Sequence, residues 1–355
     1  MLKSCTAAKN TINHYFVHKI KRSQIKKYIF VLFIAIVSVG SLFSMRIEVV
    51  RRHLDNTDCL RGVTHRLWRE AWQQAKFQDR EELAYEFIVW HYTVCRDLLS
   101  TYMTYNRHGV SAHYTIENCG TICLTVDPDK FIAYHAGVSI FRDRTNLNCY
   151  SIGIENINPG FVEMYQEVSP FGRPVQIYGD GRWWYLFSEQ QFVSSVTLTA
   201  YLQEKYKISG WDVVTHADIA IGRKSDVGPM WDYRRAYREF NAGYWPEETH
   251  RVNVDSFGSL SDSDYIALIS SFGYHMPEDH DAQAKLIRAY QMHFSTVNIS
   301  GELVSSTKKR ILEHVIGLMG HIDPITRQKY EYFHDSFAKW AEENPDKALA
   351  FSEYF

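Results

Sequence analysis

The chain has 355 residues, of which 45% are hydrophobic and 15% aromatic, so it can bury the cores of two domains and is not a disordered protein. The formal net charge of -2 is unevenly spread, because residues 1–52 hold ten Lys or Arg and one acid, whereas residues 53–355 hold 29 basic and 40 acidic residues. We therefore expect no nucleic-acid partner beyond the N-terminus.

The N-terminal region joins a basic segment to an apolar run. Residues 1–27 are rich in lysine, and residues 28–45 contain no charged side chain, which is about the minimum length for crossing a bilayer. Because positive charge before an apolar run stays in the cytoplasm, we expect residues 28–45 to be a transmembrane anchor in the inner membrane, with the rest of the chain in the periplasm. The alternatives are a cleaved signal peptide, which would release the chain into the periplasm, and a buried core helix. Leu42-Phe43-Ser44 is a poor cleavage site.

The cysteines agree with export, since disulfides form in oxidising compartments. Five of them follow the apolar run: Cys59, Cys95, Cys119, Cys123 and Cys149. An odd number leaves at least one unpaired. Cys119 and Cys123 bracket a Gly-Thr pair and could be bridged, or they could be small buried residues.

The exported part alternates predicted helices and strands. Helices are expected at 55–78, 96–105 and from Ser188 to near Gly210, and strands at 86–93, 109–117, 121–126, 148–157 and 213–216. Ser188, with Gln191 three residues later, predicts a capping box at the start of the longest helix. This order predicts an α/β fold with a mixed central sheet flanked by helices.

Polar residues stand at the ends of the apolar strands. His91 and His216 each lie near a strand end, and the loop after His216 carries Lys224 and Asp226. Two histidines and one carboxylate would leave the fourth position of a zinc ion for water, which is the catalytic arrangement. Three other residues could be ligands: Cys95, His113 and His135. An extended strand would carry Cys95 about 13 Å beyond His91, although a turn would relax that objection.

Each of these residues also has a structural interpretation. A single strand-end histidine is more often a hydrogen-bonded structural residue, and Lys224 could be a solvated loop residue. Glu155 ends another apolar run, where an isolated carboxylate is costly unless a cation or a metal meets it. The residues alone thus indicate a metal site of moderate specificity.

Five segments in the same order resemble the zinc-dependent N-acetylmuramoyl-L-alanine amidases of the amidase-2 family, whose fold is shared with peptidoglycan recognition proteins. They are IVWHYT (88–93), VSAHYTIENCG (110–120), YHAGVS (134–139), LNCYSIGIENINPG (147–160) and THADIAIGRKSDVGP (215–229). The pattern resembles the broad-specificity, envelope-located members more than the short cytoplasmic recycling enzymes. The resemblance implies hydrolysis of the amide between N-acetylmuramic acid and L-alanine in peptidoglycan or muropeptides.

The resemblance also implies a role for individual residues. The Zn²⁺ ligands fall on His91, His216 and Asp226, and the catalytic residues are Glu155, which moves protons, and Lys224, which stabilises the oxyanion with zinc. Three further residues match a segment that lines the substrate groove: His135, Ala136 and Gly137. Two alternatives remain, a non-catalytic peptidoglycan-binding protein and a zinc peptidase that cuts within the stem peptide.

The chain departs from the family in the loop of the metal site. Ile221 and Val227 stand where the family commonly has proline, so the loop loses stiffness but keeps its chemical groups. Between Pro159 and Ser188 lies an aromatic segment that would either wall the groove or pack in the core: Trp183, Trp184, Tyr185 and Phe187.

The amidase domain is expected to span residues 46–250, with a second domain at 255–320 and a charged helical tail at 321–355. Three helices are predicted in the second domain, at 261–272, 281–294 and 305–318, with six apolar positions facing inward: Ile266, Ile269, Ile287, Tyr290, Ile311 and Val315. This part resembles the small helical peptidoglycan-binding domain that follows such amidases. We expect the protein to be a monomer.

Overall fold

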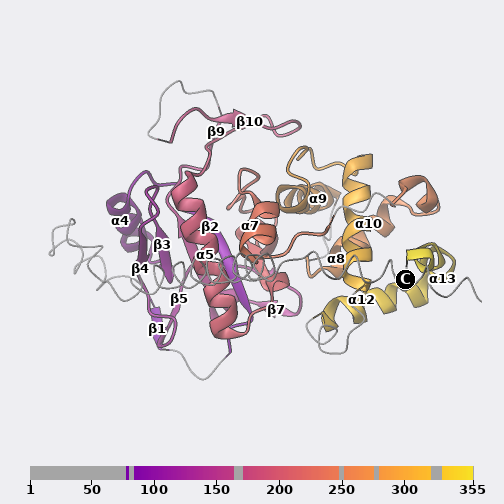
Figure 1. The fold of residues 1–355 in the computed structure, drawn as a ribbon, viewed down its shortest axis with the longest axis horizontal. Coiled ribbons are helices and arrows are strands. Elements are labelled where there is room, and N and C mark those ends of the chain that lie inside the picture. Colours follow the sequence, from indigo (N-terminus) through magenta and orange to yellow (C-terminus); the bar gives the residue numbers. More distant parts are fainter. Residues whose placement is uncertain are drawn as a thin grey trace, which may run out of the picture. The chain divides into compact units, whose positions relative to one another are not determined.

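The computed structural model describes residues 77–79, 84–163, 171–247, 252–275, 280–320 and 330–354 (Figure 1). All of them belong to one unit of contacts, Arg52–Phe355. The expected anchor at 28–45, most of the helix expected at 55–78, and Cys59 lie outside the described residues. No helix in the described ranges is long and apolar enough to cross a membrane. Phe77–Asp79 forms strand β1, so the helix predicted to reach residue 78 was wrong at its end.

A five-stranded sheet forms the centre of the fold. Its strand order is β12-β2-β8-β3-β4, and the strands are β12 (Val213–Thr215), β2 (Phe87–Tyr92), β8 (Ser151–Asn156), β3 (Tyr114–Ile116) and β4 (Ile122–Leu124). The first four strands are parallel to one another, and β4 runs antiparallel to β3. The predicted mixed sheet is confirmed, with strands shorter than expected. Every residue of β2 is buried, as expected for a strand covered on both faces.

Two long helices flank this sheet. Helix α4 (Leu98–His108) is capped by Asp97 and ends at Gly109, which has a left-handed conformation. Helix α5 (Glu189–Tyr206) lies across the sheet and contacts β3 and β8 (Figure 1).

The start of α5 differs from the predicted capping box. Ser188 accepts from the backbone N–H of Gln191 as expected, at 3.1 Å. The Gln191 side chain does not reach back to Ser188. It donates instead to the carbonyls of Ile116 and Ile157, each at 2.9 Å, and so fastens the helix to strand ends. The helix ends at Lys207, before the expected Gly210.

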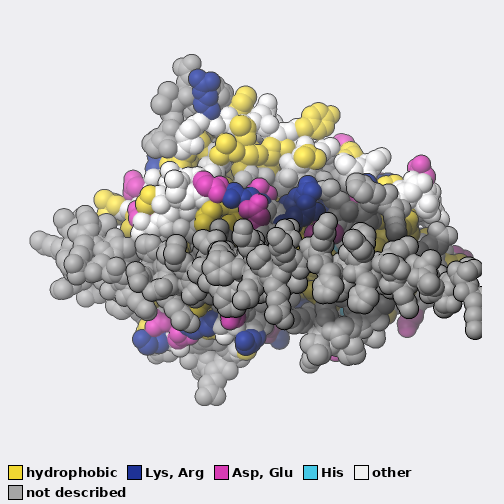
Figure 2. Space-filling model, in the orientation of Figure 1, with side chains coloured by type: hydrophobic (Ala, Val, Ile, Leu, Met, Phe, Trp, Pro, Cys, Tyr) yellow, Lys and Arg dark blue, Asp and Glu magenta, His cyan; other side chains and the backbone are white. Residues whose placement is uncertain are grey.

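The remaining strands form small antiparallel pairs and ribbons. β1 pairs with β5 (Phe131–Ala133), β6 (Ile140–Phe141) pairs with β7 (Arg144–Thr145), and β11 (Trp183–Trp184) lies between β9 (Phe161–Val162) and β10 (Val175–Gln176). Trp184 and Tyr185 are buried, so this part of the aromatic segment packs in the core and does not wall a groove. In Figure 2, hydrophobic side chains gather over the β9–β11 region, where Val175, Tyr178 and Leu186 are exposed.

The C-terminal helices agree with the predicted bounds. They are α8 (Asp262–Ser271), α9 (His280–Phe294) and α10 (Ser305–Met319), and the six apolar positions expected to face inward are all buried. The tail continues with α12 (Glu331–Glu343), α13 (Pro345–Ala348) and a 3-10 helix, Leu349–Tyr354. Helix α12 packs against α8. The domain boundaries near 250 and 320 stay predictions.

The cysteines are not bridged as one alternative suggested. Cys119 and Cys123 have no disulfide between them, and Cys123 is completely buried. The interpretation as small buried residues is therefore confirmed for Cys123 and wrong for Cys119, which is exposed.

Candidate metal centre and active site

Parallel strand ends bring the site together. Strand β2 pairs with β8 in a register that sets His91 beside Glu155, so both side chains leave the same face of the sheet. On the other side of β2, strand β12 ends at Thr215, and His216 begins the short helix α6 (His216–Ile219). Because the carboxyl ends of parallel strands meet at one edge, residues far apart in the sequence converge there.

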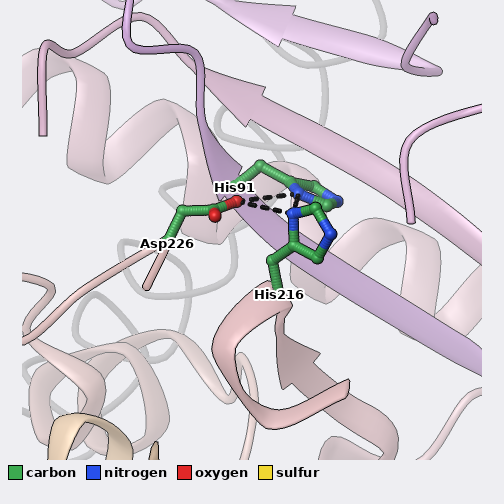
Figure 3. A group of neighbouring side chains, drawn as sticks. All are labelled: His91, His216 and Asp226. Atoms are coloured by element: carbon green, nitrogen blue, oxygen red, sulfur yellow. Dashed lines mark hydrogen bonds and ion pairs between the residues drawn. The ribbon is translucent and has the colours of Figure 1, made fainter. Parts of the chain in front are cut away.

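Three side chains point toward one another at this edge (Figure 3). Nδ1 of His91 lies 2.9 Å from Nδ1 of His216 and 3.0 Å from Oδ2 of Asp226. Nδ1 of His216 lies 2.9 Å from the same Oδ2 atom. All three residues are buried, and they form the group of possible metal ligands found in the part of the chain that the structure describes.

The outer hydrogen bonds of the two histidines show where their protons lie. Nε2 of His216 is 3.0 Å from the backbone oxygen of Ala136, which can only accept, so a neutral His216 carries its proton on Nε2. Nε2 of His135 is 3.3 Å from the backbone oxygen of Ser151, so His135 donates there. Nδ1 of neutral His135 then accepts from Nε2 of His91, at 3.0 Å. Nδ1 of His91, and Nδ1 of His216 in its neutral form, are thereby left without a proton.

The protonation states agree with this assignment. Burial, together with the neighbouring charge of His216, lowers the pKa of His91 to about 4. Burial and the charges of His91 and His113 hold the pKa of His135 well below its usual range. Burial raises the pKa of Asp226, but the interactions with His216 and His91 outweigh it and hold that pKa well below its usual range. Asp226 is therefore ionised beside a neutral His91 at neutral pH.

This donor set fits a divalent cation. Two bare imidazole nitrogens and a carboxylate oxygen within 3.0 Å of one another repel unless a positive charge lies among them. A tetrahedral ion bound at about 2.0–2.1 Å separates its ligand atoms by about 3.3 Å, a few tenths of an ångström more than these distances. Nitrogen and oxygen ligands of this kind suit zinc.

The other ligand candidates have different partners. Sγ of Cys95 lies 3.5 Å from the hydroxyl of Thr104. Nδ1 of His113 accepts from the backbone N–H of Gly153, at 3.0 Å. His135 is hydrogen-bonded to Nε2 of His91, on the side of the ring away from Asp226. None of the three belongs to the metal-ligand group, so His91, His216 and Asp226 are the set that the structure brings together.

Glu155 has the surroundings expected of the predicted general base. Its Oε2 atom is enclosed and has no hydrogen-bond partner among the described residues. Burial, followed by the charge of Asp226, raises the pKa of Glu155 well above its usual range, and the charge of Lys224 opposes this shift. A buried carboxylate oxygen without a partner is costly in a purely structural position, and a raised pKa suits a general base near neutral pH.

Lys224 lies on the exposed loop between His216 and Asp226. Its backbone N–H donates to the carbonyl of Ala220 at 3.0 Å, which closes a turn. The neighbouring Arg223 donates to the carbonyls of Ala136 and Val138, at 2.8 and 2.6 Å. These two hydrogen bonds of Arg223 therefore hold the loop against residues 136–138, which lie behind His216.

Known proteins resemble this chain in sequence and in fold. The amidase-2 family, described as N-acetylmuramoyl-L-alanine amidase, matches residues 81–229. The N-acetylmuramoyl-L-alanine amidase AmiD of Escherichia coli is 29% identical over 234 residues, which cover 62% of this chain and 79% of that protein. Its structure with the substrate anhydro-N-acetylmuramic acid-L-Ala-D-gamma-Glu-L-Lys is 27% identical, has a TM-score of 0.55, and covers 65% of this chain and 90% of that one.

A second solved structure extends the comparison. AmpDh3 from Pseudomonas aeruginosa, in complex with anhydromuramic pentapeptide, is 27% identical with a TM-score of 0.54, over 66% of this chain and 93% of that chain. The chain carries an amidase-2 domain at residues 81–229. It is therefore an N-acetylmuramoyl-L-alanine amidase, a hydrolase of the amide bond between the sugar and the first residue of the stem.

Within this amidase, the residues expected to contact substrate have mixed positions. His135 and Ala136 are buried and hydrogen-bonded to the candidate metal ligands His91 and His216. Gly137 is exposed. Substrate contact by these residues stays a prediction, and Gly137 is the one with a free surface.

Sequence reasoning missed three residues that support the amidase site. The Asn148 side chain accepts from the backbone N–H groups of His135 and Ala136, at 2.9 and 2.8 Å. Arg223 ties the metal loop down, and Gly153 makes room for the His135 ring. Only Gly153 had a sequence signal, because a glycine inside an apolar strand often marks a close approach.

Proposed function

We propose that the amidase uses a zinc ion held by His91, His216 and Asp226 to hydrolyse the amide between N-acetylmuramic acid and L-alanine in peptidoglycan or its fragments. The observation that carries this proposal is the convergence of two unprotonated Nδ1 atoms and a carboxylate oxygen within 3.0 Å. A set of three protein ligands leaves one coordination position for water or substrate, as in catalytic zinc sites. The match of residues 81–229 to the amidase-2 family, whose members the sequence resembles as zinc enzymes, supports zinc over other divalent ions.

Zinc at this position would act as a Lewis acid and lower the pKa of water to about 7. Glu155 takes the proton of the attacking water and delivers it to the departing nitrogen of alanine. Lys224, two residues before Asp226, donates a hydrogen bond to the oxygen that becomes negative. His135 and the carbonyl of Ala136 keep the ligand imidazoles in the tautomer that leaves Nδ1 bare.

The test is to identify the products by mass. The full chain is incubated with anhydro-N-acetylmuramic acid-L-Ala-D-γ-Glu-L-Lys in the presence of zinc, in the presence of a chelator, and as the variant Glu155→Gln. We expect a free tripeptide that begins with L-alanine, lost on chelation and reduced by about 10²–10⁴-fold in the variant, which keeps its zinc. Cleavage inside the stem would indicate a peptidase. An uncut substrate bound to zinc-loaded protein would indicate a binding protein.

We further propose that the amidase works in the periplasm, anchored by residues 28–45 or released by their cleavage, and that it is a monomer. The basic residues before an uncharged apolar run support this location. Extraction of membranes from expressing cells with alkaline carbonate tests the anchor. An anchored chain stays in the membrane pellet at its full mass, whereas a cleaved chain is soluble and shorter.

The helical part at 255–320 is proposed to assist in binding peptidoglycan. The alignment with AmiD spans 234 residues, more than the 81–229 region, so similarity continues beyond the amidase match.

A further inference from the structure

A cavity of about 510 Å³ lies between the loop of the catalytic lysine and helix α9. Lys224 and Ser225, which directly precede Asp226 in the chain, line it. Its lining is mainly positive, since it includes five basic side chains and one acidic side chain: Arg182, Arg223, Lys224, Lys285, Arg288 and Asp281. A cavity of this size and sign suits a small anionic ligand.

Helix α9 contributes one complete face to this cavity. The lining positions are spaced as one side of a helix: Asp281, Ala284, Lys285, Arg288, Ala289 and Met292. Two basic residues lie there between two alanines, and Lys285 is exposed while Arg288 is half-buried. The face is exposed at its first turns, and its two cations lie beside the neighbouring loop that carries Lys224.

The helix is fixed against the catalytic loop. Nδ1 of His293 lies 2.8 Å from Oδ2 of Asp218, and the hydroxyl of Tyr274 donates to Oδ1 of the same residue at 2.6 Å; all three side chains are buried. Asp218 is part of α6, which begins with the metal ligand His216. The cationic face of α9 is therefore held in place relative to the metal centre before any ligand arrives.

Lys285 and Arg288 differ in their hydrogen bonds and ion pairs with other residues. The stem of Lys285 lies over Gly222, where a Cβ atom would meet its Cδ at 2.6 Å, and the left-handed conformation of Gly222 (φ +72) lets the loop pass beneath it. No ion pair of Lys285 is found in the described ranges. Arg288 donates to the carbonyl of Ser300 and lies 3.9 Å from Asp180, which already pairs with Arg182 at 2.7 Å. Positive charge thus remains in excess around the cavity.

We propose that Lys285 and Arg288 bind the free α-carboxylate of the γ-linked glutamate in the stem peptide, so that the helical part forms one wall of the substrate site. This inference rests on the proposed function. A glutamate joined through its γ-carboxyl keeps its α-carboxylate free, and it follows directly after the alanine whose amide is cut. With Lys224 at the scissile bond, a carboxylate one residue further along the stem falls within the same cavity as the α9 cations.

The test compares two substrates and several variants of the full chain. The substrates are anhydro-N-acetylmuramic acid-L-Ala-D-γ-Glu-L-Lys and the same molecule with the glutamate α-carboxylate converted to an amide. The variants are Lys285→Ala, Arg288→Ala, the double variant and the conservative Lys285→Arg. Lys309→Ala is the matched control, because Lys309 is a half-exposed lysine of α10 that does not line this cavity. Thermal unfolding checks that each variant is folded.

We expect KM for the carboxylate substrate to rise about threefold to fivefold in each alanine variant and about tenfold in the double variant, with kcat nearly unchanged. Lys285→Arg and Lys309→Ala should keep the parent value. The amidated substrate should have a raised KM in the parent and no further rise in the double variant. Equal KM values for the two substrates in the parent, or parental KM in the double variant, would overturn the inference alone. A parent that cuts neither substrate would overturn the proposed function as well.

Discussion

Gly153 is the position at which one added methyl group should damage the metal site most specifically. It lies in the middle of β8, and a Cβ atom there would meet the His135 ring at 2.4 Å from Cγ and 2.7 Å from Nδ1. Carbon atoms in van der Waals contact are about 3.5–4.0 Å apart, so Gly153→Ala requires the ring to move by about 1 Å. A movement of this size is enough to break the 3.0 Å hydrogen bond that Nδ1 of His135 accepts from His91.

The expected cost has two parts that separate experiments can measure. Overpacking at a buried ring should reduce the free energy of unfolding of the metal-free protein by about 1–3 kcal/mol, read from urea unfolding in the presence of a chelator. Loss of the partner that orients His91 should weaken zinc binding by about 10–100-fold, read by competition with a chromophoric chelator. Gly320→Ala is the control, since a Cβ atom there meets nothing closer than 3.4 Å.

A double variant tests the cause. If the clash with the imidazole explains the loss of stability, Gly153→Ala should cost far less in a His135→Ala background, because the ring is gone. The coupling energy between the two changes should then be about 1–3 kcal/mol. Equal costs in both backgrounds, or a Gly153→Ala variant that binds zinc as tightly as the parent, would refute the reasoning.

Three further changes have expected outcomes. Because burial raises the pKa of Glu155, the folded chain keeps the carboxyl proton of Glu155 to a higher pH than the unfolded chain. Glu155 therefore lowers the free energy of unfolding as pH rises above about 4.3. Glu155→Gln should therefore raise the Tm of the metal-free protein at pH 7 but not at pH 4, and a lower Tm at pH 7 would contradict this. Asp218→Ala leaves the buried side chains of His293 and Tyr274 without this hydrogen-bond partner. It should lower the free energy of unfolding in urea by about 3–5 kcal/mol, and a loss under about 1 kcal/mol would be inconsistent with this reasoning. Asp226→Asn should abolish tight zinc binding in calorimetry while the far-UV circular dichroism spectrum stays that of the parent.

The sequence alone was sufficient to predict that the residues at strand ends lie close together. His91, Glu155 and His216 end or follow apolar runs, and the parallel order of β12, β2 and β8 brings such ends to one edge. The resemblance then assigned the roles. The helices of the C-terminal part were predicted within a few residues because their apolar spacing is regular.

Features that depend on contacts between distant residues were not predictable in this way. Gln191 fits a capping box by spacing alone, but its side chain finds two strand-end carbonyls 34 and 75 residues away. The use of Nδ1 by His91 depends on His135, 44 residues later in the chain. The sequence alone does not show that the basic residues of α9 share a cavity with Lys224, because α9 lies beside that loop only in the folded chain.

The coordination of the metal tests the central claim most directly. We would load the purified full chain with zinc, count the bound ions and record the X-ray absorption spectrum at the zinc edge, with Asp226→Asn in parallel. The account expects one zinc per chain, with nitrogen and oxygen ligands at about 2.0–2.1 Å, two of them imidazoles, and loss of the ion in the variant. A sulfur ligand at about 2.3 Å, or an unchanged spectrum in Asp226→Asn, would contradict it.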